Sequence, residues 1–367
     1  MNLGRFHVAI NRIVVEIEGA NLPELMAQLE TTLQQSIQQP NDNTANAFRE
    51  KLKEVRERLM SAESNSAHPT WLEAFIEINA SSRIGKGLLS RIDKTIQENN
   101  MTPSLALSNI KKINVDFKQF FERAKSIDDS LGDLGIEFDD LDDGEFEVGF
   151  SIPRKITSDR LISLNKEISE IDYCIRTISE ISNEDGSSPS VSTISASNWH
   201  IFLDSAPATA ACIAITLNKI VNLYKTNLEI KNLKRQLDEK NLPEKVTRPL
   251  EEYIEETVAN HLRKIGDEIV DEFYKGDEGR KNELKNGLPR ALRYLAGRLD
   301  KGAKIEVNAR PRSNDNEGEE NPEITKINQS VDLINKNMSE ITSLEVDGNP
   351  TLFVDYDQEV EKSNDSD

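Results

Sequence analysis

Apolar residues recur at alternating intervals of three and four along much of the chain, which places them on one stripe of an α-helix. The spacing is clearest in the segments 110–131, 161–178 and 324–341. The first stripe consists of Ile110, Ile113, Phe117, Phe120, Ala124, Ile127 and Leu131. Because each run is short, the pattern favours helices packed in an intramolecular bundle, with an intermolecular coiled coil as the alternative.

Further helices are expected at about 44–62, 71–98, 205–241 and 247–275. The third of these is the longest, and Pro243 follows its end. Asn227 and Lys234 occupy positions of its coiled-coil spacing where an apolar residue would otherwise pack. Polar residues at such seam positions fix the register between helices, so these two are candidate seam residues.

Alternation of apolar and polar residues predicts two short, half-buried strands at 146–152 and 304–310. A short hairpin is expected within 344–354, where two apolar runs flank turn residues. The stretch 6–17 fits a strand and a helix equally well. The chain is therefore expected to be an α+β protein, predominantly α-helical, in which long amphipathic, coiled-coil-like helices pack with a small β-sheet.

Runs of acidic residues divide the chain into parts. Residues 128–147 contain ten acids and no Lys or Arg, and 313–323 contains five acids. Such runs do not form a core. The expected order is an N-terminal helical region (1–127), an acidic loop (128–145), an α+β core (146–312), an acidic linker (313–323), a C-terminal helix and hairpin (324–356) and a disordered tail (357–367).

The overall charge is strongly negative, but basic residues gather in one stretch. The 367 residues carry a formal net charge of −20, whereas residues 280–312 contain ten Lys and Arg against three acids. On a helix at about 288–301, the candidate binding residues Arg290, Arg293, Tyr294, Arg298 and Lys301 share one face. Leu292, Leu295, Ala296 and Leu299 share the opposite face.

Three interpretations compete for this basic face. It is solvated or paired with acids of the same molecule, such as those at 128–147. Alternatively, it binds a phosphate backbone, with Tyr294 stacking on an exposed base. A membrane-surface role is the third, weakened by the scarcity of large aromatic residues beside the leucines.

Recognisable chemistry is scarce. The chain has no GxxxxGK[ST] phosphate loop and no GxSxG nucleophile turn, and its four histidines are too far apart for an HExxH zinc helix. Cys174 and Cys212 lie in apolar settings and are expected to be buried, small core residues. No catalytic residue, metal site or cofactor is therefore expected.

Compartment and membrane contact follow from composition. With two cysteines, the chain does not resemble a disulfide-stapled secreted scaffold, and a cytoplasmic location is expected. The uncharged stretch 205–218 is shorter than the roughly 20 residues of a spanning helix, so no membrane insertion is expected. The predicted function is a non-enzymatic intracellular scaffold or adaptor that engages itself or a protein partner through helical surfaces. The alternative is an accessory nucleic-acid-binding protein that uses the basic helix, and an enzyme without a recognisable motif is the third possibility.

Overall fold

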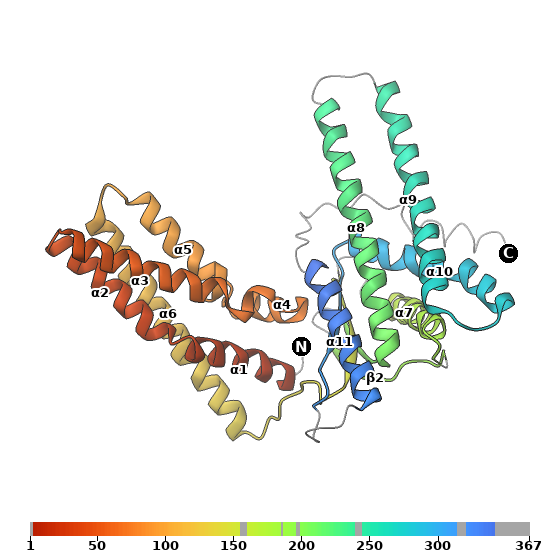
Figure 1. The fold of residues 1–367 in the computed structure, drawn as a ribbon, viewed down its shortest axis with the longest axis horizontal. Helices are drawn as coiled ribbons and strands as arrows, with labels where there is room; N and C mark the ends of the chain where they lie inside the picture. The colour runs from red at the N-terminus through yellow and green to blue at the C-terminus, as the bar shows by residue number, and fades with distance from the viewer. Residues whose placement is uncertain are drawn as a thin grey trace. The chain divides into compact units, whose positions relative to one another are not determined.

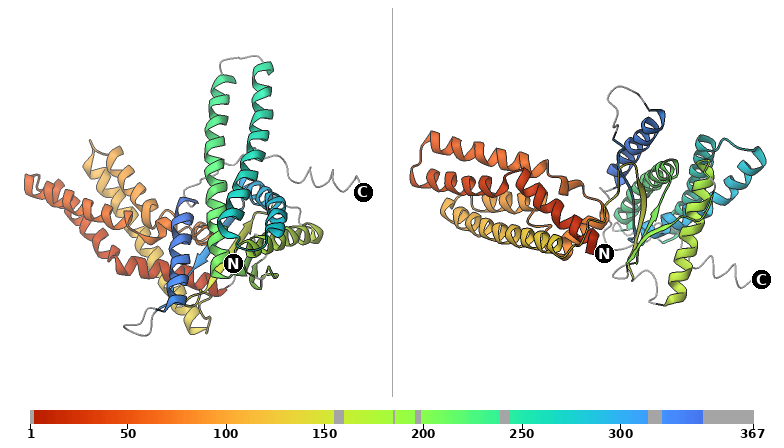
Figure 2. Two further views of the ribbon diagram at one scale, coloured as in Figure 1. Left: turned by 45° about the vertical axis from the view of Figure 1, so that its right-hand side comes forward. Right: turned by 90° about the horizontal axis from the view of Figure 1, so that it is seen from below.

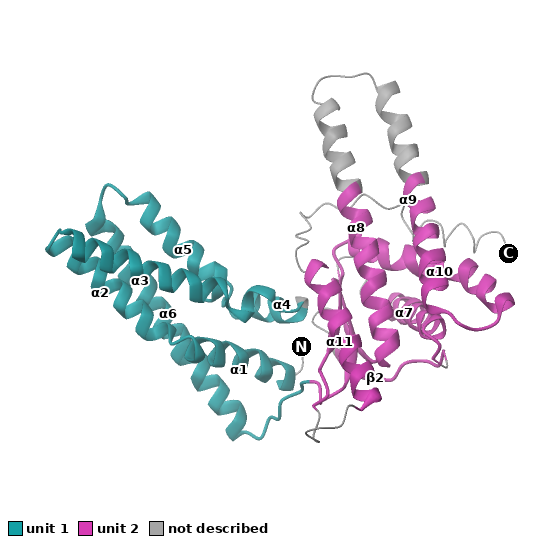
Figure 3. Ribbon diagram, in the orientation of Figure 1, with its two compact units in different colours: residues 1–140 teal, residues 141–367 magenta. Residues whose placement is uncertain are grey.

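A computed structural model describes residues 3–154, 160–184, 186–195, 199–238, 244–313 and 321–341, without the side chains of 69, 195 and 227–256. The chain forms two compact units, Met1–Asp140 (unit 1) and Leu141–Asp367 (unit 2) (Figure 3). The described residues form eleven α-helices, one short 3-10 helix and one four-stranded antiparallel sheet. The prediction of a predominantly helical α+β fold is confirmed.

Unit 1 is helical throughout its described elements (Figure 1). These are α1 (Leu3–Gly19), α2 (Leu22–Gln38), α3 (Asp42–Met60), η1 (Glu63–Ser66), α4 (Pro69–Glu77), α5 (Gly85–Glu98) and α6 (Pro103–Asp133). The ambiguous stretch 6–17 is helical because its helical stripe, including Ile10, Ile13 and Ile17, is buried in the core, whereas Val15 is exposed. Sequence reasoning did not identify α2, although Leu25, Met26, Leu29 and Leu33 carry the helical spacing and are buried.

Two expectations for unit 1 are corrected. The predicted helix at 71–98 is broken by a turn between α4 and α5, because Asn79 and Gly85 both adopt positive φ, of 57° and 45°. The predicted acidic loop at 128–145 begins inside α6, which continues to Asp133. The acids at the end of α6 are compatible with a helix because its buried face ends at Ala124. Beyond that residue the acidic side chains lie largely on the solvent side.

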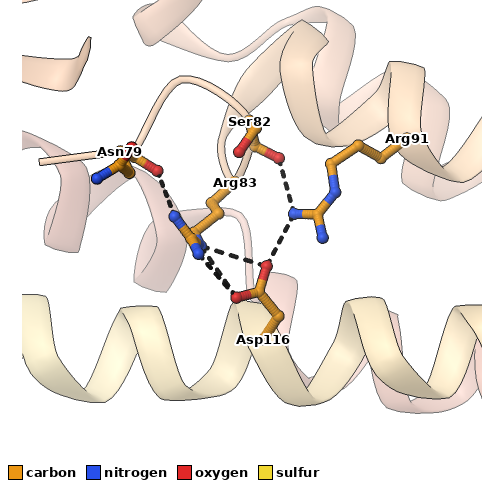
Figure 4. A network of polar contacts seen from close by, with 5 residues as sticks. All are labelled: Asn79, Ser82, Arg83, Arg91 and Asp116. Carbon is orange, nitrogen blue, oxygen red and sulfur yellow. Dashed lines mark hydrogen bonds and ion pairs between the residues drawn. The ribbon is translucent and has the colours of Figure 1, made fainter.

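A polar network joins the turn between α4 and α5 to α6 (Figure 4). Asp116 accepts hydrogen bonds from Arg83 Nε (3.2 Å) and Nη2 (2.9 Å), and Arg91 Nη1 lies 2.9 Å from its other oxygen. Arg83 also donates to the Asn79 carbonyl (2.6 Å), and Arg91 donates to the Ser82 carbonyl (3.0 Å). The two guanidinium groups therefore tie the backbone of the turn to one carboxylate.

Replacing this carboxylate tests the network by its pH dependence. The hydrogen bond from Arg83, followed by that from Arg91, lowers the pKa of Asp116, so its stabilising effect is present above the unfolded carboxyl pKa of about 3.9 and disappears as the pH falls further. We expect Asp116→Asn to lower the free energy of unfolding of unit 1 by about 1 kcal/mol at neutral pH, since the group is one-third exposed, and by less below pH ~4. Urea unfolding followed by Trp71 fluorescence in a Trp199→Phe background measures this loss. Glu98→Gln, in an exposed pair with Lys94, is the control expected to change nothing, and an equal loss in both variants would contradict the assignment.

Unit 2 packs helices against the sheet. Its elements are β1 (Phe146–Ile152), α7 (Leu161–Ile181), β2 (Val191–Ser195), β3 (Trp199–Asp204), α8 (Pro207–Asp238), α9 (Glu244–Phe273), α10 (Glu278–Asp300), β4 (Lys304–Ala309) and α11 (Pro322–Ile341). The strand order is β2-β3-β1-β4. One sheet face, with Val148, Phe150 and Ile201, joins a core built with residues of α7 to α11. Helix α11 lies alongside α8 (Figure 1), and α8 and α9 lie side by side, as the left view of Figure 2 shows.

The expectation of half-buried strands is wrong for β1, which is buried on both faces. Glu147 and Glu306 lie on the second face and are 2% and 3% exposed. Asn308 Nδ2 donates to both of them, at 3.4 and 3.1 Å. Gly149 allows the ring of Phe202 to pack closely against β1 on this face, because a Cβ at position 149 would lie 2.5 Å from that ring.

Several expectations fall outside what is described. The backbone of α8 includes Asn227 and Lys234, but their side chains lie outside the description, so their predicted seam role stays a prediction. The predicted hairpin at 344–354, the tail at 357–367 and most of the acidic linker, 314–320, also lie outside the described residues.

Candidate interaction surfaces

Helix α10 carries the predicted basic face. Asp277 caps its start by accepting from the Arg280 amide (3.1 Å), and Arg298 in its last turn opposes the negative end of the helix dipole. Leu288, Leu292 and Leu295 are buried in the core of unit 2, as the leucine side of the helix requires.

Two members of the predicted basic face are buried as well. Tyr294 is 1% exposed and Arg298 is 3% exposed. Arg298 donates to both carboxylate oxygens of Glu167 on α7, through Nε at 2.9 Å and through Nη2. Tyr294 donates its hydroxyl to the same carboxylate at 2.8 Å, and burial, followed by the charge of Glu167, raises the pKa of that hydroxyl. Tyr294 and Arg298 therefore do not belong to an exposed binding face. Arg298 is paired with an acid of the same molecule, although that acid lies on α7 and not in the segment 128–147.

The remaining members lie nearer the surface. The side chain of Arg290 is 55% exposed, donates to Glu170 on α7 (2.8 Å) and stacks over the ring of Tyr173 at 4.6 Å. Arg293 is exposed, and Lys301 is half-buried just after the end of α10. The exposed arginines of the predicted face are therefore Arg290 and Arg293, which do not form a continuous stripe with Arg298.

The start of α10 is also paired within the molecule. Arg280 donates to Glu180 on α7 (2.5 Å), and this hydrogen bond lowers the pKa of Glu180. Lys285 and Lys281 lie 2.7 and 2.9 Å from Asp271 on α9, and the hydrogen bonds from Lys285 and then Lys281 lower the pKa of that carboxyl. These carboxylates come from α7 and α9, which sequence reasoning did not foresee.

The predicted acidic segment 128–147 contacts the basic stretch of unit 2 at the end of β4. Arg310 Nε lies 3.0 Å from Asp143 Oδ1, and Arg310 Nη1 donates to the Leu141 carbonyl at 2.8 Å. Both groups of this ion pair are half exposed. The pair therefore joins the end of β4 to the loop that precedes β1, and it does not shield a buried charge.

Exposed apolar side chains gather at the start of α7. Leu161 is 83% exposed, Ile162 75% and Ile168 39%. Farther along the same helix, Ile171, Ile175 and Ile178 are buried in the core of unit 2. The apolar spacing thus extends beyond the part of α7 that is buried among the described residues. Sequence reasoning left open whether this stripe packs within the molecule or against another helix, and it did not single out the first half.

The two cysteines are buried, as predicted. Burial raises the pKa of the Cys174 thiol well above its usual value and that of Cys212 to about 12. Thiols in this state are poor nucleophiles at neutral pH.

One hollow of about 650 Å³ lies in unit 1, lined by His7, Phe138 and carboxylates of α6. His7 is buried and already engaged, since Nδ1 lies 2.7 Å from the Ile136 carbonyl and Nε2 3.4 Å from Asp128. We assign this arrangement a structural role, in which α1 is held against the segment that follows α6.

Metal-binding clusters and membrane-spanning helices are absent from the described part of the chain. The described residues contain no group of three or more His, Cys, Asp or Glu arranged to hold a metal ion. Within the same residues, every helix is too short or too polar to cross a bilayer. No protein-family model, curated protein or solved structure matches this chain.

Proposed function

We propose that the chain is a non-enzymatic cytoplasmic scaffold or adaptor that engages itself or a protein partner through helical surfaces. The observation that carries this proposal is the exposed start of α7, where Leu161 and Ile162 are 83% and 75% exposed. Large apolar side chains concentrated at one surface site are typical of contact surfaces, because their burial against a partner is worth about 1.5–3 kcal/mol each.

The α7 stripe also supports a helical mode of contact. Leu161, Leu164 and Ile168 follow the same spacing as the residues that pack inside unit 2. An amphipathic helix of a partner would continue that packing beyond the edge of the unit.

No specific observation favours the nucleic-acid alternative. Tyr294 and Arg298 are buried, and Arg290 already donates to Glu170. An enzymatic role likewise gains no support from the described residues.

The proposal is tested by changing the start of α7. The tagged chain and its tagged double variant Leu161→Glu, Ile162→Glu are each purified from the native host. In both cases the host also expresses a second copy of the chain with a different tag. Because both side chains are exposed, the variant should fold normally while recovery of the second copy or of specific partner proteins falls about tenfold or more.

A matched control places the same added charge elsewhere on unit 2. Asn282→Glu, Asn286→Glu changes two exposed residues of α10 and is expected to retain the wild-type set of partners. Identical recovery with both double variants would contradict a contact surface at the start of α7.

A further inference from the structure

We propose that strand β2 pairs with β2 of a second copy of this chain, which joins two four-stranded sheets edge to edge. The inference rests on the proposed function, in the form in which the chain engages itself, and adds a second surface with its own geometry. It begins from the position of β2, which pairs with β3 on one side and with no strand of the described residues on the other.

An edge strand presents a row of backbone N–H and C=O groups that another strand can bind. Soluble proteins usually protect such edges with charged side chains. Here the thirteen residues 186–198 contain no charged residue, in a chain of which 30% is charged. The edge therefore carries no charged side chain that would disfavour an incoming strand.

The exposed side chains of β2 extend the apolar face of the sheet. Val191 lies opposite Leu203 and Ile194 lies opposite Ile201 on β3, and residues directly opposite share a face. Leu203 and Ile201 are buried in the core, whereas Val191 and Ile194 are each 55% exposed. A strand added beyond β2 would cover both.

The absence of charge favours a second copy as the occupant. In a two-fold pairing each strand meets itself, so any charged residue near the axis would face a like charge. An uncharged strand avoids this repulsion, which matters for a chain of net charge −20. In the joined sheet, Val191 and Ile194 of both copies would lie on the same apolar face.

The pairing is short, because β2 has five residues and an irregularity between Val191 and Thr193. We therefore expect a weak dimer whose population rises with protein concentration. In light scattering, the wild-type full-length chain should rise from its monomer mass of 41.4 kDa towards twice that value over the micromolar range.

The variant Val191→Lys, Ile194→Lys should stay monomeric, because four lysines would meet at the axis. The control Ile76→Lys, Val115→Lys makes the same chemical change at residues of unit 1 that are 62% and 55% exposed, and it should dimerise as the wild type does. Circular dichroism and thermal unfolding check that all three proteins fold. A wild-type chain that stays monomeric, or a β2 variant that dimerises like the control, would overturn the proposal.

Crosslinking provides an independent readout. Both natural cysteines are buried, so Ile194→Cys introduces an exposed thiol that a short bis-maleimide can join to its copy. We expect a covalent dimer with Ile194→Cys and little with Val115→Cys, and equal yields would overturn the proposal. If dimers persist in the β2 lysine variant but are lost in Leu161→Glu, Ile162→Glu, the β2 inference fails while the helical surface stands.

Discussion

Replacing Arg298 by alanine is expected to lower the free energy of unfolding of unit 2 by about 3–5 kcal/mol, because it leaves the Glu167 carboxylate buried without its cation. The side chains of Arg298 and Glu167 are 4% and 5% exposed, so water cannot replace the lost partner without opening the α7–α10 interface. The Tyr294 hydroxyl would remain as the partner of that carboxylate within the network, and one neutral donor does not offset the cost of burying a charge.

Two further variants separate this charge effect from a loss of packing. Arg298→Met together with Glu167→Met removes both charges and keeps the volume, and it should recover most of the lost stability. Arg290→Met acts on a pair whose arginine is 55% exposed and should cost about 1 kcal/mol or less. Urea unfolding of a Trp71→Phe background, in which Trp199 of β3 reports on unit 2, measures all three. Equal losses for Arg298→Ala and Arg290→Met would contradict a buried structural role for Arg298.

Replacing Gly87 by alanine is expected to destabilise unit 1 by about 3 kcal/mol, since the added methyl group has no space. A Cβ at this position would lie 1.7 Å from the Ser81 carbonyl oxygen and 2.8 Å from its carbon. Both are backbone atoms of the turn that Arg83 and Arg91 hold in place (Figure 4), so the contact cannot be relieved by rotating a side chain. Helix α5 would have to move away from the turn, and the Asp116 network would be lost with it.

Gly132 is the matched control. It lies in the last turn of α6, and a Cβ there meets nothing within 4 Å. Gly132→Ala should therefore be neutral or stabilise unit 1 by about 0.5 kcal/mol, because alanine is the better helix former. Trp71 fluorescence in a Trp199→Phe background follows unit 1 during urea unfolding. A neutral Gly87→Ala would contradict the close packing of α5 on the turn.

Periodicity predicted the fold class and several elements, but not α2 or β3. The apolar spacing predicted α6, α7 and α11, and the alternation predicted β1 and β4. These patterns are local, because one side of each element packs against a core. Spacing did not reveal the break between α4 and α5, where apolar residues continue but Asn79 adopts a left-handed backbone conformation. Gly85, which follows this break, begins α5.

The candidate site could be predicted less well, for a physical reason. The two faces of α10 follow from its own sequence, but the environment of each face depends on residues far away in the chain. Glu167 lies 131 residues before Arg298, and no local pattern predicts their contact. Similarly, the stripe of α7 does not indicate where the cover provided by other helices ends, so the exposure of Leu161 and Ile162 became visible only in the folded chain.

Association through apolar surfaces is the proposed basis of function, whereas much of the charge of α10 is paired within the molecule. The most direct test is the molar mass of the full-length chain, measured by light scattering at one high protein concentration as the salt concentration is raised. Salt screens the repulsion between chains of net charge −20 and leaves apolar contacts intact, so the mass should stay above 41.4 kDa or increase. A mass that falls to the monomer value with salt would indicate association through exposed charges, and a monomer at every salt concentration would contradict self-association altogether.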